Sequence, residues 1–184
     1  EFQKMMDQVY ATLAGETRPE SEEMGVAPGE VGVTRRLPEV SLDDLTGLLE
    51  HLAESDLPQH DIYLLEDELG VDTDRLLRLT ETAELLGFAV IGNGDMELTP
   101  LGQTFAEASI LARKEIFAAR ARRLPMMRWL LKMLHAAGDQ RLKWDVVESA
   151  LNLEFPPEVA QSQLENLINW GRYGELLAYD VQTE

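Results

Sequence analysis

The sequence predicts a mainly α-helical protein built from two winged-helix-like halves in tandem, with one or two short β-hairpins. Apolar residues recur at spacings of three and four along most of the 184 residues, which is typical of amphipathic helices. In one stretch, ELLGFAVIGNGDMELTPLG at 84–102, this spacing gives way to a tight turn between two short apolar runs. Three helices followed by a hairpin is the winged-helix order.

The first 37 residues are expected to divide into a helix and a linker. Residues 15–37 are rich in Gly, Pro and Glu and have no sustained periodicity, so they are predicted to be a linker. Residues 1–14 are predicted to form an amphipathic helix, which needs a partner surface. Its apolar stripe consists of Phe2, Met5, Met6, Val9, Tyr10 and Leu13.

The first half, 38–110, is expected to begin with three helices, over about 41–55, 62–69 and 73–86. Small polar residues precede the first and third of these, and glycines follow the second and third, as helix termini commonly require. The predicted caps and stops are Ser41, Gly70, Asp72 or Thr73, and Gly87.

A hairpin is expected to follow the third helix. Strands are predicted over 88–91 and 96–99, with Asn93–Gly94 supplying the positive-φ residues of the turn. Pro100 suits the first turn of a new helix, with Thr99 as its cap.

The second half, 111–184, is expected to repeat this plan less clearly. One long helix is predicted from Pro100 to about Arg123, with a break near Pro125. The segment GELLA near 174 weakly resembles ELLGF near 84, which favours a second winged-helix-like unit over a single bundle. The remaining predicted elements are helices over 126–138, 143–154 and 156–171 and a short strand over 174–180.

Composition narrows the chemistry that is expected. The chain has no cysteine, and its three histidines are scattered, so we expect no disulfide, no zinc site and no cofactor. It has no apolar run of membrane-spanning length and no secretory signal pattern, which predicts a cytoplasmic protein without direct membrane insertion. P-loop, nucleophile-elbow and zinc-protease motifs are absent, so an independent catalytic activity is not expected.

The predicted wing is unsuited to DNA. Residues 38–108 contain two arginines and seventeen acidic residues, and the wing itself carries Asp95 and Glu97 without a cation. Phosphate contacts require Lys or Arg, and a surface of this charge repels a duplex. We therefore expect no DNA binding by the first wing.

The basic residues gather instead between 113 and 143, where nine Lys and Arg face only two acidic residues. This cluster could be a solvated face that pairs with the acidic first half. It could also dock an acidic partner or anionic lipid head groups, or bind a nucleic acid. The candidate docking residues are Arg113, Lys114, Arg120, Arg122 and Arg123.

Three segments together resemble a known family: RLPEVSLDDLTGLLEHL at 36–52, ELLGF with DMELTPLGQTFAEASILARKEIF within 84–117, and NWGRYGELLAYD at 169–180. The resemblance is to the C-terminal AAA-associated domain, which follows the ATPase domain in ATP-binding subunits of bacterial ABC transporters for nitrate, sulfonate, taurine or bicarbonate. The stretch 1–14 is similar to the last helix after such an ATPase domain, which is itself missing. The chain has no Walker or signature motif, so no catalytic residue is carried over.

The resemblance implies a cytoplasmic accessory domain, peripheral to the inner membrane through its transporter. Its implied partners are the ATPase domain and the permease of that transporter, and a second copy, because such ATPase subunits work in pairs. The main hypothesis is a regulatory docking module, and the alternative is a winged-helix transcriptional or nucleic-acid-binding protein. A third option is an anion sensor in which Arg172 contacts the anion, although an arginine near a helix end can also bind carbonyl groups there.

Overall fold

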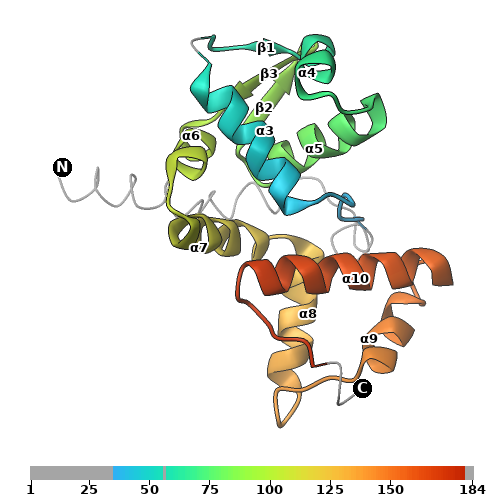
Figure 1. Ribbon diagram of the computed structural model, residues 1–184. Coiled ribbons are helices and arrows are strands. Elements are labelled where there is room, and N and C mark those ends of the chain that lie inside the picture. Colours follow the sequence, from blue (N-terminus) through green and yellow to red (C-terminus); the bar gives the residue numbers. More distant parts are fainter. Residues whose placement is uncertain (1–34, 56, 181–184) are drawn as a thin grey trace, which may run out of the picture.

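The computed structural model describes residues 35–55 and 57–180 (Figure 1). The helix predicted over 1–14 and most of the predicted linker lie outside these residues. The described chain is mainly helical and contains a small antiparallel sheet, as the sequence predicted. Its helices are all too short or too polar to cross a bilayer.

The three helices of the first half begin and end at the predicted residues. They are α3 (Leu42–Glu54), α4 (Ile62–Leu69) and α5 (Thr73–Leu85). The Ser41 hydroxyl accepts from Asp44 N at 3.4 Å, and the Asp72 carboxylate accepts from Arg75 N at 2.9 Å. Gly70 ends α4 with a φ of 62°, the left-handed conformation that favours glycine.

The hairpin consists of β2 (Ala89–Gly92) and β3 (Asp95–Leu98), joined by Asn93 and Gly94 with φ of 55° and 90°. A further strand, β1 (His60–Asp61), pairs with β3 and gives the sheet order β1-β3-β2. The sequence analysis missed β1, because a strand of two residues has no alternating pattern to detect.

The prediction of a single long helix after the hairpin is wrong. The chain forms α6 (Pro100–Glu107) and α7 (Ile110–Ala121), separated by Ala108 in an extended conformation. Ser109 explains the break, because its hydroxyl accepts from Ala112 N at 3.4 Å and so caps a new helix.

The second half contains α8 (Pro125–Ala136), α9 (Trp144–Leu151) and α10 (Pro157–Tyr173). The strand predicted over 174–180 is wrong, so the second half has no hairpin within the described residues. Leu176 N instead donates to Gly171 O at 2.8 Å, and the Leu177 side chain covers Gly171. The turn folds residues 174–177 back onto the end of α10, where they have no neighbouring strand to pair with.

A continuous apolar core joins the two halves. Phe117 of α7 contacts Trp170 of α10 edge to face, with 5.6 Å between ring centroids. Gly102 of α6 lies against the backbone of Phe88, where a Cβ atom would overlap the Phe88 carbonyl. The first contact fixes α10 against α7, and the second fixes α6 against the residue that precedes β2.

The last residues of the predicted linker are clamped onto α10. Leu37 N donates to Gln163 Oε1 at 2.7 Å, and Gln163 Nε2 donates back to Leu37 O at 3.1 Å. Asn166 Nδ2 donates to Pro38 O at 2.9 Å. Leu37 is only 3% exposed. The first segment of the described chain is therefore bound to its last helix.

Candidate docking surface

Four of the five predicted docking residues, all except Arg122, have interactions within the described chain. Arg113 forms an ion pair with Glu50 of α3 at 2.6 Å. Its guanidinium also donates to the carbonyls of Phe105 at 3.0 Å and of Ala106, which lie at the end of α6. Arg113 therefore holds α3, α6 and α7 together at the helix break.

Arg120 belongs to α7, and its guanidinium lies at the C-terminal end of α5. Its Nε donates to Leu86 O at 2.6 Å, and its guanidinium lies directly over Gly87. The pKa of Arg120 is lowered, mainly because the group is partly buried and also because Arg123 is near. The role of Arg120 in this structure is to close the C-terminus of α5 against α7.

Lys114 is paired with Glu175, which follows α10. The Lys114 Nζ atom lies 2.8 Å from Glu175 Oε1, and this hydrogen bond raises the pKa of Lys114. The contact joins the exposed side of α7 to the turn after α10. Part of the basic cluster thus pairs within the molecule.

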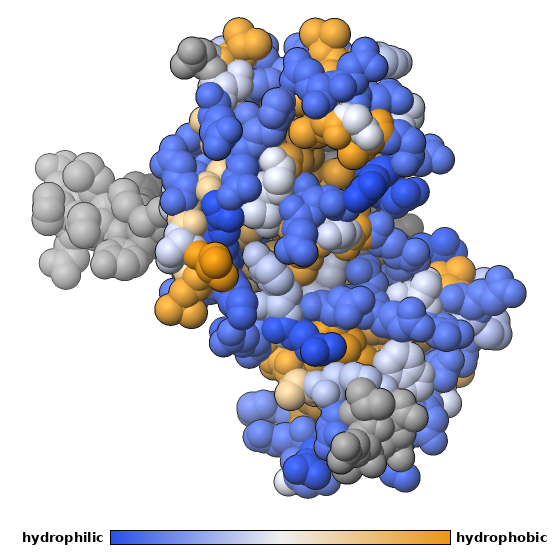
Figure 2. Space-filling view, viewed as in Figure 1, coloured by the Kyte–Doolittle hydropathy of each residue, from blue (hydrophilic) through white to orange (hydrophobic). Residues whose placement is uncertain are grey.

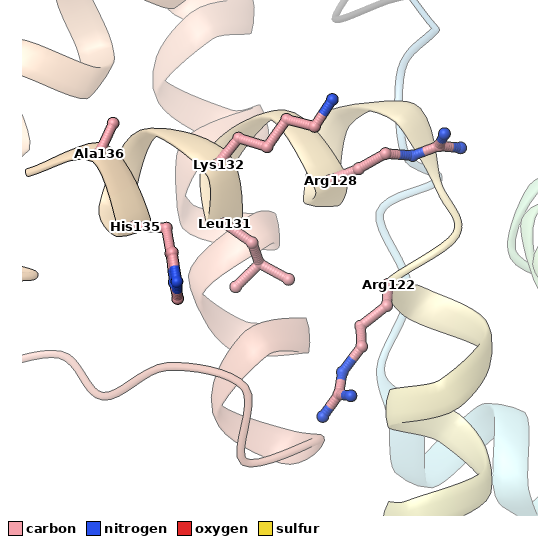
Figure 3. Close-up of a pocket in the computed structure, with 6 residues that line it drawn as sticks. All are labelled: Arg122, Arg128, Leu131, Lys132, His135 and Ala136. Atoms are coloured by element: carbon pink, nitrogen blue, oxygen red, sulfur yellow. The ribbon is translucent and has the colours of Figure 1, made fainter.

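Arg122 is placed differently, at the edge of a hollow of about 560 Å³ that α8 lines with one face (Figure 3). We call this surface the α8 face. In Figure 3, Arg122, Leu131 and His135 point into one shared space, while Arg128 and Lys132 extend along the helix beside it. The α8 face consists of Arg122, Arg128, Leu131, Lys132, His135 and Ala136.

The cations of the α8 face are not neutralised by the described part of the chain. Within it, no ion pair is formed by Arg122, Arg128 or Lys132. Arg128 donates to the backbone carbonyl of Arg123 at 2.8 Å, which orients the guanidinium without cancelling its charge. Arg123, the fifth predicted docking residue, also has an interaction of its own.

A second hollow, of about 240 Å³, continues from Arg122 along α7. It is bordered by Leu111, Lys114 and Ala118 and by Glu175 after α10. Figure 2 shows a largely hydrophilic face with a few separate apolar patches. The two hollows share Arg122, and in the second Glu115 and Glu175 lie beside the cations.

Arg128 and Lys132 belong to the predicted basic cluster but were not among the candidate docking residues. His135 was considered only as one of three scattered histidines. The signal was present in MMRWLLKMLHAAG, because residues at spacings of three and four share a helix face. Arg128, Leu131, Lys132 and His135 have that spacing.

Arg172, the predicted anion contact, is exposed in the last turn of α10 rather than beyond its end. Among the described residues, no group of three His, Asp or Glu lies close enough to hold a metal ion. The wing carries Asp95 and Glu97, and Arg75 of α5 is bound to Asp44. Within the described residues, neither Asp95 nor Glu97 forms an ion pair with a Lys or Arg.

Comparison with known proteins gives one match. A family model described as the C-terminal AAA-associated domain matches residues 63–180. The matched range extends from α4 to the end of the described chain and includes the whole α8 face. No curated protein and no solved structure matches the chain.

Proposed function

Because the chain belongs to the family of C-terminal AAA-associated domains, we propose that it is the non-catalytic regulatory domain of the ATP-binding subunit of a bacterial ABC importer. The family match over 63–180 carries this proposal, since it indicates an accessory domain of an ATPase. The importer class is supported by the resemblance of 36–52, 84–117 and 169–180 to the nitrate, sulfonate, taurine and bicarbonate group. Such a domain would work in the cytoplasm, at the inner membrane through its transporter.

The proposed mode of action is docking through the α8 face onto the ATPase domain or the permease. Arg122, Arg128 and Lys132 offer uncompensated positive charge around the apolar side chain of Leu131. An acidic surface with an exposed apolar residue would complement this arrangement. Charges of this kind govern association rate and salt dependence more than the affinity itself.

The clamp on Leu37 supports a route by which a displacement of the chain before residue 35 could reach the α8 face. The chain that precedes residue 35 continues directly into a segment fixed by Gln163 and Asn166 of α10. In turn, α10 packs against α7 and α8. A displacement of the preceding polypeptide would therefore act on the helix that supports the α8 face.

The test is the ATPase rate of the complete transporter, with and without residues 36–184, measured in nitrate, a sulfonate, taurine and bicarbonate. Deletion is expected to change the basal or the substrate-stimulated rate at least twofold. The triple variant Arg122→Glu, Arg128→Glu and Lys132→Glu should reproduce the change. Arg141→Glu with Lys143→Glu, on the loop before α9, is the control for charge reversal. Rates unaffected by deletion in every anion would contradict the proposal.

An effector role for Arg172 is tested by the same assay. If the domain senses the transported anion, deletion should alter the rate in one anion only, and Arg172→Ala should remove that response. Arg172 is suited to this because it is exposed and its side chain forms no hydrogen bond or ion pair with the described residues. An equal effect of deletion in all four anions would support docking and contradict anion sensing by the domain.

The nucleic-acid alternative predicts a steep loss of affinity for duplex DNA as salt is raised. We expect no binding by the intact chain even at low salt, because the net charge is −18 and the wing is acidic. Salt-sensitive binding that Arg128→Glu and Lys132→Glu abolish would favour the alternative.

A further inference from the structure

The α8 face has a counterpart of opposite charge elsewhere in the chain. On α5, Asp74, Leu77, Arg78 and Glu81 are all exposed and share one side of the helix. We call them the α5 face. Leu77 is 52% exposed. Like Leu131, it lies beside charged residues.

The charges of the α5 face are also uncompensated. Neither Asp74 nor Glu81 forms an ion pair with a described residue. Arg78 lies at one edge and reduces the negative charge by one, while Arg75, on another side of the helix, is bound to Asp44. The α5 face therefore carries one apolar side chain and one cation between two carboxylates.

The two faces cannot neutralise each other within one molecule. Figure 1 shows α5 in the upper part of the structure and α8 in the lower part, with α10 between them. Among the residues that the structure describes, neither face has a partner of opposite charge. A second copy of the chain has both faces.

The dimensions of the faces correspond. Asp74 and Glu81 are seven residues apart, as are Arg128 and His135, so each pair spans about 10 Å along its helix. Leu77 and Leu131 occupy equivalent positions, three residues after Asp74 and Arg128. Two helices packed along these faces would bring Asp74 and Glu81 near Arg122, Arg128 and Lys132. Leu77 would then approach Leu131, which is half-buried.

We infer that copies of this chain associate through the α8 face of one and the α5 face of the other. A single pair of helices buries less area than the roughly 1,200 Å² that stable interfaces need. A dimer in which each copy contributes both faces forms the contact twice and so doubles the buried area. The expected assembly is a closed, salt-sensitive dimer. This inference concerns the chain alone and does not depend on the proposed transporter function.

The first experiment is sedimentation of the intact chain at several protein concentrations. At about 50 mM salt, where screening is weak, the mass should rise with concentration from 20.7 kDa to twice that value. At about 500 mM salt the Debye length is only a few ångströms. The dissociation constant of the dimer should then be at least tenfold higher than at low salt. A chain that stays monomeric at low salt and high concentration would overturn the inference.

The decisive experiment exchanges the charges. Variant one is Arg128→Glu with Lys132→Glu, and variant two is Asp74→Lys with Glu81→Lys. Each variant alone should be monomeric. Its α5 face and its α8 face then carry charge of the same sign, so they repel each other when two identical copies meet. An equimolar mixture should form dimers again, since each variant then supplies the face that the other needs.

The controls match the change in net charge at other exposed positions. They are Arg141→Glu with Lys143→Glu for variant one, and Glu154→Lys with Glu158→Lys for variant two; both should dimerise as the wild type does. Variants that still dimerise alone, or a mixture that remains monomeric, would contradict the contact. So would a monomeric wild type that binds phosphatidylserine vesicles through the α8 face, since that face would then serve a lipid surface.

Discussion

At the scale of single residues, the fold depends on a few positions where the backbone of one element approaches another. Gly102 is one, because α6 lies on the Phe88 carbonyl with no room for a side chain. Gln163 is another, because its amide pairs with both backbone groups of Leu37 in a buried site. Neither role follows from the sequence, since a glycine or a glutamine within a helical pattern gives no indication of what lies opposite.

Gly102→Ala is expected to lower the free energy of unfolding by about 2 kcal/mol, a typical cost of overpacking. Gly47 is a matched control, because it lies within α3 with no atom near the position of its Cβ. Gly47→Ala should raise stability by about 0.5–1 kcal/mol through helix propensity. Urea denaturation of both variants measures the difference, and equal effects would refute the close contact of Gly102 with Phe88.

Gln163→Leu is expected to cost about 2 kcal/mol, because it leaves the buried Leu37 N–H without an acceptor. It should also increase proteolysis near residues 35–38. Gln161→Leu, on the exposed side of the same helix, should change neither. Limited proteolysis with thermal denaturation would test this, and a Gln163→Leu variant as protected as the wild type would argue against the clamp.

At the scale of elements, caps were predictable and interruptions were not. Ser41, Asp72 and Thr99 act as N-caps, as expected, because each precedes an apolar helical stripe. Ser109 was missed, because the periodicity of apolar residues continues through it. The strand expected over 174–180 was wrong, because a strand needs a neighbour and this segment turns back onto Gly171.

The break between α6 and α7 gives a prediction for Ser109. Ser109→Ala should lower stability by about 1 kcal/mol, the usual cost of losing an N-cap. Ser149→Ala, at an exposed position inside α9, should have no effect or raise stability slightly. Thermal unfolding followed by circular dichroism compares the two. If Ser109→Ala were neutral, the cap would not determine where α7 begins.

At the scale of the whole molecule, charge was the most informative property of the sequence. It located the basic cluster within 113–143 and predicts that the wing does not bind DNA. It could not separate Arg113 and Arg120, which serve the fold, from Arg122, which faces a hollow. That division depends on which carbonyls and carboxylates lie within reach, and only the folded chain specifies them.

The net charge of −18 also predicts how stability responds to salt. Screening should relieve repulsion among the acidic residues more than it weakens ion pairs such as Arg113–Glu50. Raising salt from about 50 to 500 mM is therefore expected to raise the melting temperature by roughly 3–5 °C. Calorimetry at fixed protein concentration tests this, and a lower melting temperature in high salt would show that the ion pairs dominate.

The clamp on Leu37 and the turn at Gly171 both lie on α10, only about 12 Å apart along the helix axis. The described chain begins beside α10, whereas its last residues lie against α9, where the Tyr179 ring is 5.7 Å from the Trp144 ring. A shortened chain should keep its fold only if it begins before residue 36, because Leu37 then stays bound to Gln163. A chain that begins at residue 38 would leave the Gln163 amide buried without its backbone partner.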